Sequence, residues 1–234
     1  PSFGESTFET AQAYQGLWKN WNGTGDSWAA MWGHVAARFA GRPEVVGLNL
    51  FNEPFAGDFY HHPLIMVPWP SPTNADRVNL QPAYDKVNAA VRAVDEDVLL
   101  FIAGVTWGDL GSGFTTAPGG AAYANRTVIT YHFYDPPQFT AEEQLRSHAV
   151  EARRLGMAAM LTETEALWRP GVYPHNKNKE NLTDACDQEL VGWCDWEWKS
   201  FFREGPGDEK SPSQYYEWGT PKTGQGLNWA GPDA

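Results

Sequence analysis

The stretch GLNLFNEPFAGD, Gly47 to Asp58, begins as an apolar run and turns polar at Asn52-Glu53-Pro54. A short apolar run of this kind is typical of a strand that is buried on both faces. Pro54 lacks a backbone N–H and disfavours the helical conformation of the residue before it. We therefore expect the strand to end here with Glu53 in an extended conformation, so that a carboxylate stands where a buried strand stops.

Helical and strand patterns alternate along the rest of the chain. Helices are predicted at residues 26–41, 82–95, 141–156 and 185–191, and strands at residues 45–51, 98–104, 127–134, 157–167 and 192–198. Asp26 is the expected N-cap of the first helix, and Gly41 and Gly156 are expected helix ends. Such alternation predicts parallel strands joined by right-handed helical crossovers, and hence an α/β fold with both faces of the sheet covered.

Three long loops, residues 54–80, 107–124 and 168–183, all follow predicted strands. In a (β/α)8 TIM barrel the loops after the strands build the active site. Five strands are fewer than a closed barrel needs, so residues 1–234 are expected to form one partial TIM-barrel catalytic domain holding about the last five of its strands. An open doubly wound sheet is the alternative fold, but the chain has no Gly-rich phosphate turn of the dinucleotide-binding type.

The composition narrows the classes of function. A chain of 234 residues with 42% hydrophobic positions can bury a sizeable core, and a net charge of -12 with scattered basic residues argues against a nucleic-acid partner. Twelve Trp residues suit the faces of sugar rings as well as core packing. Cys186 and Cys194 can form one disulfide or remain free thiols, and they lack zinc-ligand spacing. We expect no metal, no cofactor and no obligate protein partner.

Three Asn-x-Thr sequons, at Asn22, Asn125 and Asn181, favour a secreted or lysosomal protein of the secretory pathway. No run reaches the roughly 18 apolar residues that span a bilayer. The chain begins with Pro1, so a signal segment is not visible in it.

Glu53 and Glu163 each close a predicted strand. Glycosidic cleavage uses two such carboxylates, of which one donates a proton to the leaving oxygen while the other attacks or stabilises the sugar carbon. A Glu at a strand end is more often a surface or ion-paired residue. Position alone therefore does not decide whether Glu53 and Glu163 are catalytic or are such surface residues. The amide of Asn52 can bind a sugar hydroxyl or can simply favour a turn.

Several segments resemble one branch of glycoside hydrolase family 5 (clan A), the endoglycoceramidases. They are GLNLFNEPFAG, NLQPAYDKVNAAVRAVDEDVLLF, VTWGD, GFTTAPGGAAYANRTVITYHFYDPP, LTETEAL and CDQELVGWCDWEWKSFF. The resemblance covers residues 26–203 and implies a retaining hydrolase that releases an intact oligosaccharide from the ceramide of a glycosphingolipid. It implies that Glu53 is the acid/base and Glu163 the nucleophile.

The resemblance also assigns binding residues. It implies that Asn52 binds the 2-hydroxyl of the cleaved sugar, that His132 and Tyr134 order the acid/base and touch the nucleophile, and that Trp196 is a sugar platform. Without the resemblance, core packing is an equally good interpretation of His132, Tyr134 and Trp196. Such a substrate would bring the protein to a membrane surface.

Two departures from the family pattern stand out. Thr164 and Glu165 follow Glu163 where the family has an aromatic residue and Gly, and strand alternation places both glutamates on one face. The first three strand-helix units, with an Arg and a His of the family's site, have no counterpart in the chain. Two alternatives therefore stay open: a cellulase-like hydrolase or β-glucosidase acting on soluble β-glucosides, and an inactive carbohydrate- or lipid-binding relic.

Overall fold

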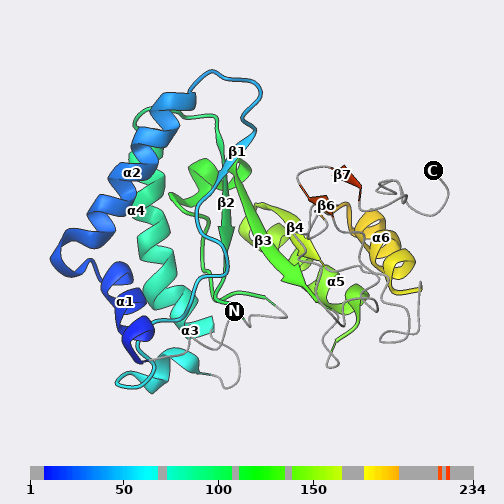
Figure 1. The fold of residues 1–234 in the computed structure, drawn as a ribbon, viewed down its shortest axis with the longest axis horizontal. Helices are drawn as coiled ribbons and strands as arrows, with labels where there is room; N and C mark the ends of the chain where they lie inside the picture. The colour runs from blue at the N-terminus through cyan, green and yellow to red at the C-terminus, as the bar shows by residue number, and fades with distance from the viewer. Residues whose placement is uncertain are drawn as a thin grey trace. The chain divides into compact units, whose positions relative to one another are not determined.

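Strands and helices alternate in the folded chain as the sequence predicts (Figure 1). A computed structural model describes residues 8–67, 73–106, 111–134, 139–164 and 177–194, together with residues 216–217 and 220–221. The described residues fall into two compact units. The first holds those up to Tyr131 and from Glu143 to Met160, and the second holds His132–Glu142 and those from Leu161 onward.

Five strands form one sheet in the order β1-β2-β3-β4-β5. They are β1 (Gly47–Asn49), β2 (Leu99–Ala103), β3 (Thr127–Phe133), β4 (Ala158–Thr164) and β5 (Gly192–Trp193). Strand β2 is parallel to both of its neighbours, with Leu100 opposite Leu48 on one side and Thr127 on the other. The strands lie in sequence order without the reversal that defines a doubly wound sheet. The predicted barrel-type topology is therefore confirmed over the open doubly wound alternative.

Three helices of the first unit pack near β1 and β2: α1 (Phe8–Trp18), α2 (Thr24–Phe39) and α4 (Gln81–Arg92). Helices α2 and α4 pack side by side (Figure 1). Tyr84, Val87 and Val91 repeat at helical spacing along α4 and are fully buried. The hydroxyl of Tyr84 donates to the carbonyl of Ala103 at 2.9 Å, which ties α4 to the end of β2. Among the helices that the structure describes, none has both the length and the hydrophobicity of a membrane-spanning segment.

The start of the chain differs from the prediction. Helix α1 was not expected, and its Trp18 packs against Trp28 of α2 and Phe51 after β1. Tertiary packing, rather than a strong sequence pattern, holds such a helix. The predicted N-cap Asp26 is wrong, because α2 begins at Thr24 with Gly23 at its N-cap.

Two predicted loops contain helix. Residues 54–80 include η3 (Pro63–Met66), α3 (Thr73–Ala75) and η4 (Asp76–Leu80), the last a π-helical turn that leads directly into α4. Residues 120–124 of the second loop belong to η5 (Gly120–Arg126). Short helical turns leave too few periods to be recognised in a Pro- and Gly-rich sequence.

The later elements largely follow the prediction. Helix α5 (Ala141–Leu155) ends at Gly156, whose φ of 72° is the left-handed conformation expected of a C-terminal glycine. Helix α6 (Lys177–Glu189) begins earlier than predicted, so residues 177–183 are helical rather than loop. The antiparallel pair β6 (Tyr216–Glu217) and β7 (Thr220–Pro221) was not predicted. Both cysteines are free: Cys186 of α6 is buried, whereas Cys194 is exposed.

Candidate active site

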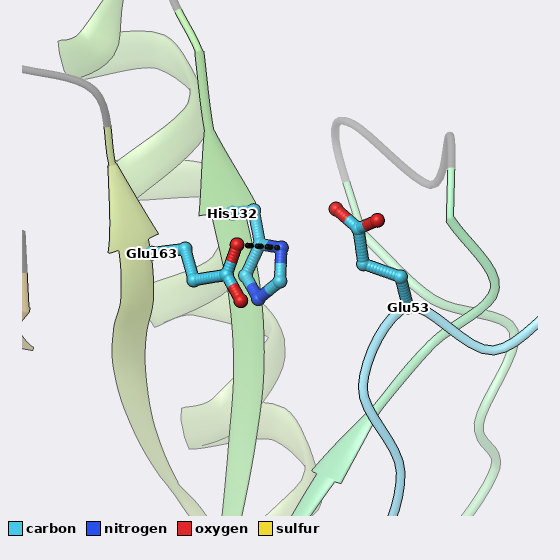
Figure 2. A group of neighbouring side chains, drawn as sticks. All are labelled: Glu53, His132 and Glu163. Carbon is cyan, nitrogen blue, oxygen red and sulfur yellow. Dashed lines mark ion pairs between the residues drawn. The ribbon is translucent and has the colours of Figure 1, made fainter. Parts of the chain in front are cut away.

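Two polar side chains contact Glu163 near the end of β4. Tyr134 donates its phenolic O–H to Oε2 of Glu163 at 2.7 Å. Nδ1 of His132 lies 3.4 Å from the same oxygen, as the dashed line in Figure 2 marks. The side chains of His132 and Glu163 are each 14% exposed, so the pair is largely withdrawn from water but still accessible. Within the second unit, the structure therefore brings together three of the residues predicted for the site.

The strand pattern explains this meeting. Strand β3 is buried along its length except at His132, its only partly exposed residue. Tyr134 follows two residues later, so its side chain leaves on the same side as that of His132. In β4, Leu161 and Thr164 are buried while Glu163 between them is partly exposed. Neighbouring strands thus place a phenol, an imidazole and a carboxylate at one end of the sheet.

A carboxylate with these two neighbours is a fixed group rather than a freely rotating one. A phenolic donor and an imidazole that approach the same oxygen restrict the rotation of the Glu163 side chain. An ionised and oriented carboxylate can attack a sugar carbon to form a covalent intermediate.

Glu53 lies in the first unit, on the loop that follows β1, and is labelled in Figure 2. Strand β1 ends at Asn49, earlier than predicted. The φ of Glu53 is 44°, in the left-handed region, so the expectation of an extended backbone before Pro54 is wrong. A residue with a Cβ costs roughly 1–2 kcal/mol in this conformation. Directly after Glu53 the loop is fixed by a backbone hydrogen bond, because the carbonyl of Pro54 accepts the N–H of Thr106 at 2.9 Å.

Of the other residues considered for the site, the structure describes only Asn52. Asn52 is exposed on the same turn as Glu53. Trp196 and Glu165 lie outside the described residues. Glu53, His132 and Glu163 are also residue types that ligate a divalent cation. Carboxylate-catalysed glycoside cleavage needs no such ion.

Sequence reasoning missed the buried residues that hold the loop after Glu53. Asp58 is only 2% exposed, and its carboxylate binds the side-chain amide of Gln12 and lies 2.7 Å from Nδ1 of His61. Its backbone N–H donates to Oε1 of Gln15 at 3.0 Å. Asp58 closes the stretch that marks β1, but its partners Gln12 and Gln15 lie on α1, a helix that the sequence pattern did not reveal.

The sequence profile of the cellulases, glycosyl hydrolase family 5, matches residues 9–202, most of the chain. The chain belongs to glycosyl hydrolase family 5. Glu53, His132, Tyr134 and Glu163 all lie inside the matched range.

This family 5 chain is similar to two endoglycoceramidases of known sequence. It is 40% identical over 195 residues to the one from Cyanea nozakii and 37% identical over 195 residues to the one from Hydra vulgaris. Each match covers 83% of this chain, but 38% and 36% of those relatives respectively. The family 5 chain therefore spans well under half the length of the curated relatives it matches.

Solved structures confirm the family 5 fold. Endo-glycoceramidase II from Rhodococcus sp., in complex with a five-membered iminocyclitol, matches with a TM-score of 0.68 at 21% identity, over 92% of this chain and 48% of that one. Endoglucanase Cel5A from Pseudomonas stutzeri matches with a TM-score of 0.57 at 19% identity, over 80% of this chain and 56% of that one. The fold is that of part of a TIM barrel, as the alternation of elements predicts.

Side chains from two helices hold the loop that follows β2 in this family 5 chain. Asp76 of η4 is fully buried and accepts the backbone N–H groups of Val105 at 2.6 Å and Gly113 at 2.9 Å. Glu151 of α5 accepts the backbone N–H of Ser112 at 2.8 Å and its hydroxyl at 2.6 Å. A Cβ at Gly113 would lie 1.6 Å from a backbone oxygen of α3, so only glycine permits this close approach. Buried carboxylates therefore fix a loop at the carboxyl end of the sheet.

We expect Asp76→Asn to change how stability depends on pH. Burial raises the pKa of Asp76 from 3.8 to about 7, and the charge of Glu151 acts in the same direction. Because the folded pKa is the higher one, this group's stabilising contribution is complete below about pH 4 and is lost as pH rises through about 7. Over that window Asp76 should lower the free energy of unfolding by up to about 1.4 kcal/mol per pH unit.

Urea unfolding at a series of pH values measures this slope. The Asn variant cannot ionise, so we expect the part of the slope that Asp76 contributes to disappear. Asp97→Asn is the matched control, because it makes the same substitution at a side chain that is 88% exposed. An unaltered slope in the Asp76 variant would show that this carboxyl does not titrate in the window.

Proposed function

We propose that the protein is a retaining endo-β-glycosidase that hydrolyses the linkage between oligosaccharide and ceramide in glycosphingolipids. The observation that carries the proposal is Glu163, a strand-end carboxylate held by Tyr134 and His132. It occurs in a family 5 chain whose curated relatives are named endoglycoceramidases. One structure of similar fold is a ganglioside GM3 complex of endo-glycoceramidase II, which supports a glycolipid as the substrate class.

The proposed reaction has two steps that use two carboxyl groups. Glu163 attacks the anomeric carbon, the bond from that carbon to the ceramide oxygen breaks, and protonated Glu53 gives its proton to the departing oxygen. Glu53 then removes a proton from water, and the resulting hydroxide displaces Glu163 from the anomeric carbon. Two inversions give net retention, which requires carboxyl groups roughly 5–5.5 Å apart.

Other residues have supporting roles in this proposal. The amide of Asn52 binds the 2-hydroxyl of the sugar at the cleavage point, and the ring of Trp196 stacks on a sugar face. Tyr134 and His132 orient Glu163 through the contacts described above. No step needs a metal or a cofactor.

Hydrolysis of soluble β-glucosides is a second candidate. The match to the cellulase profile and the fold likeness to an endoglucanase favour it. The two candidates differ in the group that leaves, which is ceramide in one case and a second sugar in the other.

Incubation of the protein with ganglioside GM3 and, separately, with cello-oligosaccharides distinguishes these functions. We expect free intact trisaccharide and ceramide from the ganglioside, detected by thin-layer chromatography and mass spectrometry. Cleavage of cello-oligosaccharides with intact ganglioside would assign the second function. Binding of either compound without cleavage would assign the protein to the non-catalytic class.

We also propose a location in the secretory pathway and a role in lipid metabolism. The sequon residues Asn22 and Asn125 are exposed, which supports access for glycosylation. Secretion of a glycosylated protein from a eukaryotic host, and a mass decrease on deglycosylation, would test the location.

A further inference from the structure

One turn on the loop after β1 presents apolar side chains to solvent. In η3 and the residue after it, Ile65 and Met66 are buried, whereas Leu64 is 72% exposed and Val67 is 46% exposed. Asn74 of α3 donates its side-chain amide to the carbonyl of Leu64 at 2.6 Å. The turn is therefore held by this hydrogen bond and by its two buried side chains, with Leu64 and Val67 on the solvent side.

The same turn borders an apolar hollow of about 490 Å³. The hollow is lined by Leu64, Val67, Thr73, Asn74, Arg77 and Gly113. It lies entirely within the first unit.

Two cations lie near this turn, Arg77 in the lining of the hollow and Lys19 in contact with the segment that follows Arg77. Arg77 donates to the amide oxygen of Asn74 at 2.6 Å, and Lys19 donates to the carbonyl of Val78 at 2.7 Å. Within the part of the chain that the structure describes, neither cation makes an ion pair. Residues 59–75 contain no Asp or Glu, and the next acid, Asp76, is fully buried. In a chain of net charge -12, the surface around Arg77 and Lys19 is therefore a local region of positive charge.

We propose that Leu64, Val67, Arg77 and Lys19 form a rim surface that docks the protein on bilayers containing anionic lipid. The two apolar side chains enter the interface between headgroups and acyl chains, while the two cations bind lipid phosphate or carboxylate groups. Charge complementarity selects an anionic lipid surface over a neutral one. The lipid binding does not depend on the proposed function. Only its consequence, that docking brings a membrane-embedded substrate within reach, rests on the proposed function.

The position of the rim surface agrees with this role. Its apolar residues Leu64 and Val67 lie on the segment that follows β1, and Glu53 lies on the loop directly after β1. Loops that follow strands emerge at the carboxyl end of the sheet, where barrel enzymes build their active sites. A protein docked through the rim surface therefore turns the loop of Glu53 toward the lipid.

Flotation with vesicles of phosphatidylcholine, with and without phosphatidylserine, tests the proposal. We expect binding to increase with phosphatidylserine and to weaken as salt is added. Leu64→Asp should lower the partition coefficient at least about tenfold, since it removes the burial of a leucine side chain. Arg77→Gln should lower it about fivefold, and only for vesicles that contain phosphatidylserine.

Two variants at the opposite end of the sheet are matched controls. Val46 is 68% exposed and directly precedes β1, so Val46→Asp introduces the same charge at a similarly exposed apolar site. Arg38→Gln removes a cation from the last turn of α2. We expect both variants to bind vesicles as the unmodified protein does. Thermal unfolding confirms folding of each variant, and Leu64→Ser replaces Leu64→Asp if the charge destabilises the turn.

Several outcomes would overturn the docking proposal. Equal losses for Leu64→Asp and Val46→Asp would show a general charge effect, and insensitivity to phosphatidylserine would remove the cations' role. Self-association lost in Leu64→Asp, without vesicle binding, would assign the rim surface to a second copy of the chain. The vesicles contain no glycolipid, so failure to cleave gangliosides despite intact vesicle binding would overturn only the proposed function.

Discussion

Glu163→Gln is expected to abolish covalent labelling by a fluorinated sugar substrate. The amide keeps the shape of the carboxyl group and can still accept the Tyr134 hydrogen bond, but it is a poor nucleophile. Glycoside hydrolysis should fall by several orders of magnitude. Intact-protein mass spectrometry measures the result, because the unmodified protein gains the mass of one glycosyl group and the variant gains none.

Two further variants separate loss of the nucleophile from loss of its orientation. Tyr134→Phe removes the 2.7 Å hydrogen bond but leaves the carboxylate, so labelling should slow by roughly 10- to 100-fold and still reach completion. Glu165→Gln should label at an unchanged rate. Complete labelling of Glu163→Gln, with none in the Glu165 variant, would instead identify Glu165 as the nucleophile.

The strand positions could be predicted because strands that are buried on both faces consist mainly of apolar residues. Strand β3 is buried on both faces up to His132, and its first four residues, 127–130, form an apolar and β-branched run. The two-residue spacing of His132 and Tyr134 then fixes that both side chains leave the strand on one side. The spacing accounts for the shared side alone, because the contact of these two residues with Glu163 was implied only by the resemblance to the endoglycoceramidases.

The remaining features depend on partners far apart in the chain. Asp58 is held by Gln12 and Gln15 of α1, and Asp76 is held by backbone groups of Val105 and Gly113. A single Asp in a loop has the same sequence signature whether it is solvated or buried. The left-handed backbone of Glu53 is likewise hidden, because a residue before proline favours the opposite conformation.

The second large effect is expected for Glu53→Gln, and its size should depend on the leaving group. Ceramide leaves as a basic alkoxide that needs a proton, so loss of the acid should lower kcat/KM on a glycosphingolipid by about 10²- to 10⁴-fold. An aryl glycoside with an acidic phenol leaves without that proton, so formation of its glycosyl-enzyme should be nearly unaffected. Burst kinetics with the aryl substrate and steady-state rates with the glycolipid measure the two losses.

Added azide distinguishes the proposed roles of the two glutamates. In Glu53→Gln, azide needs no base and should attack the glycosyl-enzyme, giving a glycosyl azide of retained configuration. In Glu163→Ala, azide should attack the substrate directly from the face that Glu163 has vacated, giving the inverted product. The same configuration from both variants would contradict the division into acid/base and nucleophile.

The backbone conformation of Glu53 allows an independent test of whether the loop that carries its carboxyl group is strained. Its φ of 44° is costly for any residue with a Cβ, and strain at such a position persists when the surrounding contacts over-determine the loop. Glu53→Gly should therefore have a free energy of unfolding about 1 kcal/mol above that of Glu53→Ala, although both lack the carboxyl group. Equal stability would mean that the turn is not strained. If the glycine variant is more stable than the alanine variant, the surrounding contacts hold the loop in a conformation that costs stability. Such a cost is expected where a side chain is positioned for chemistry.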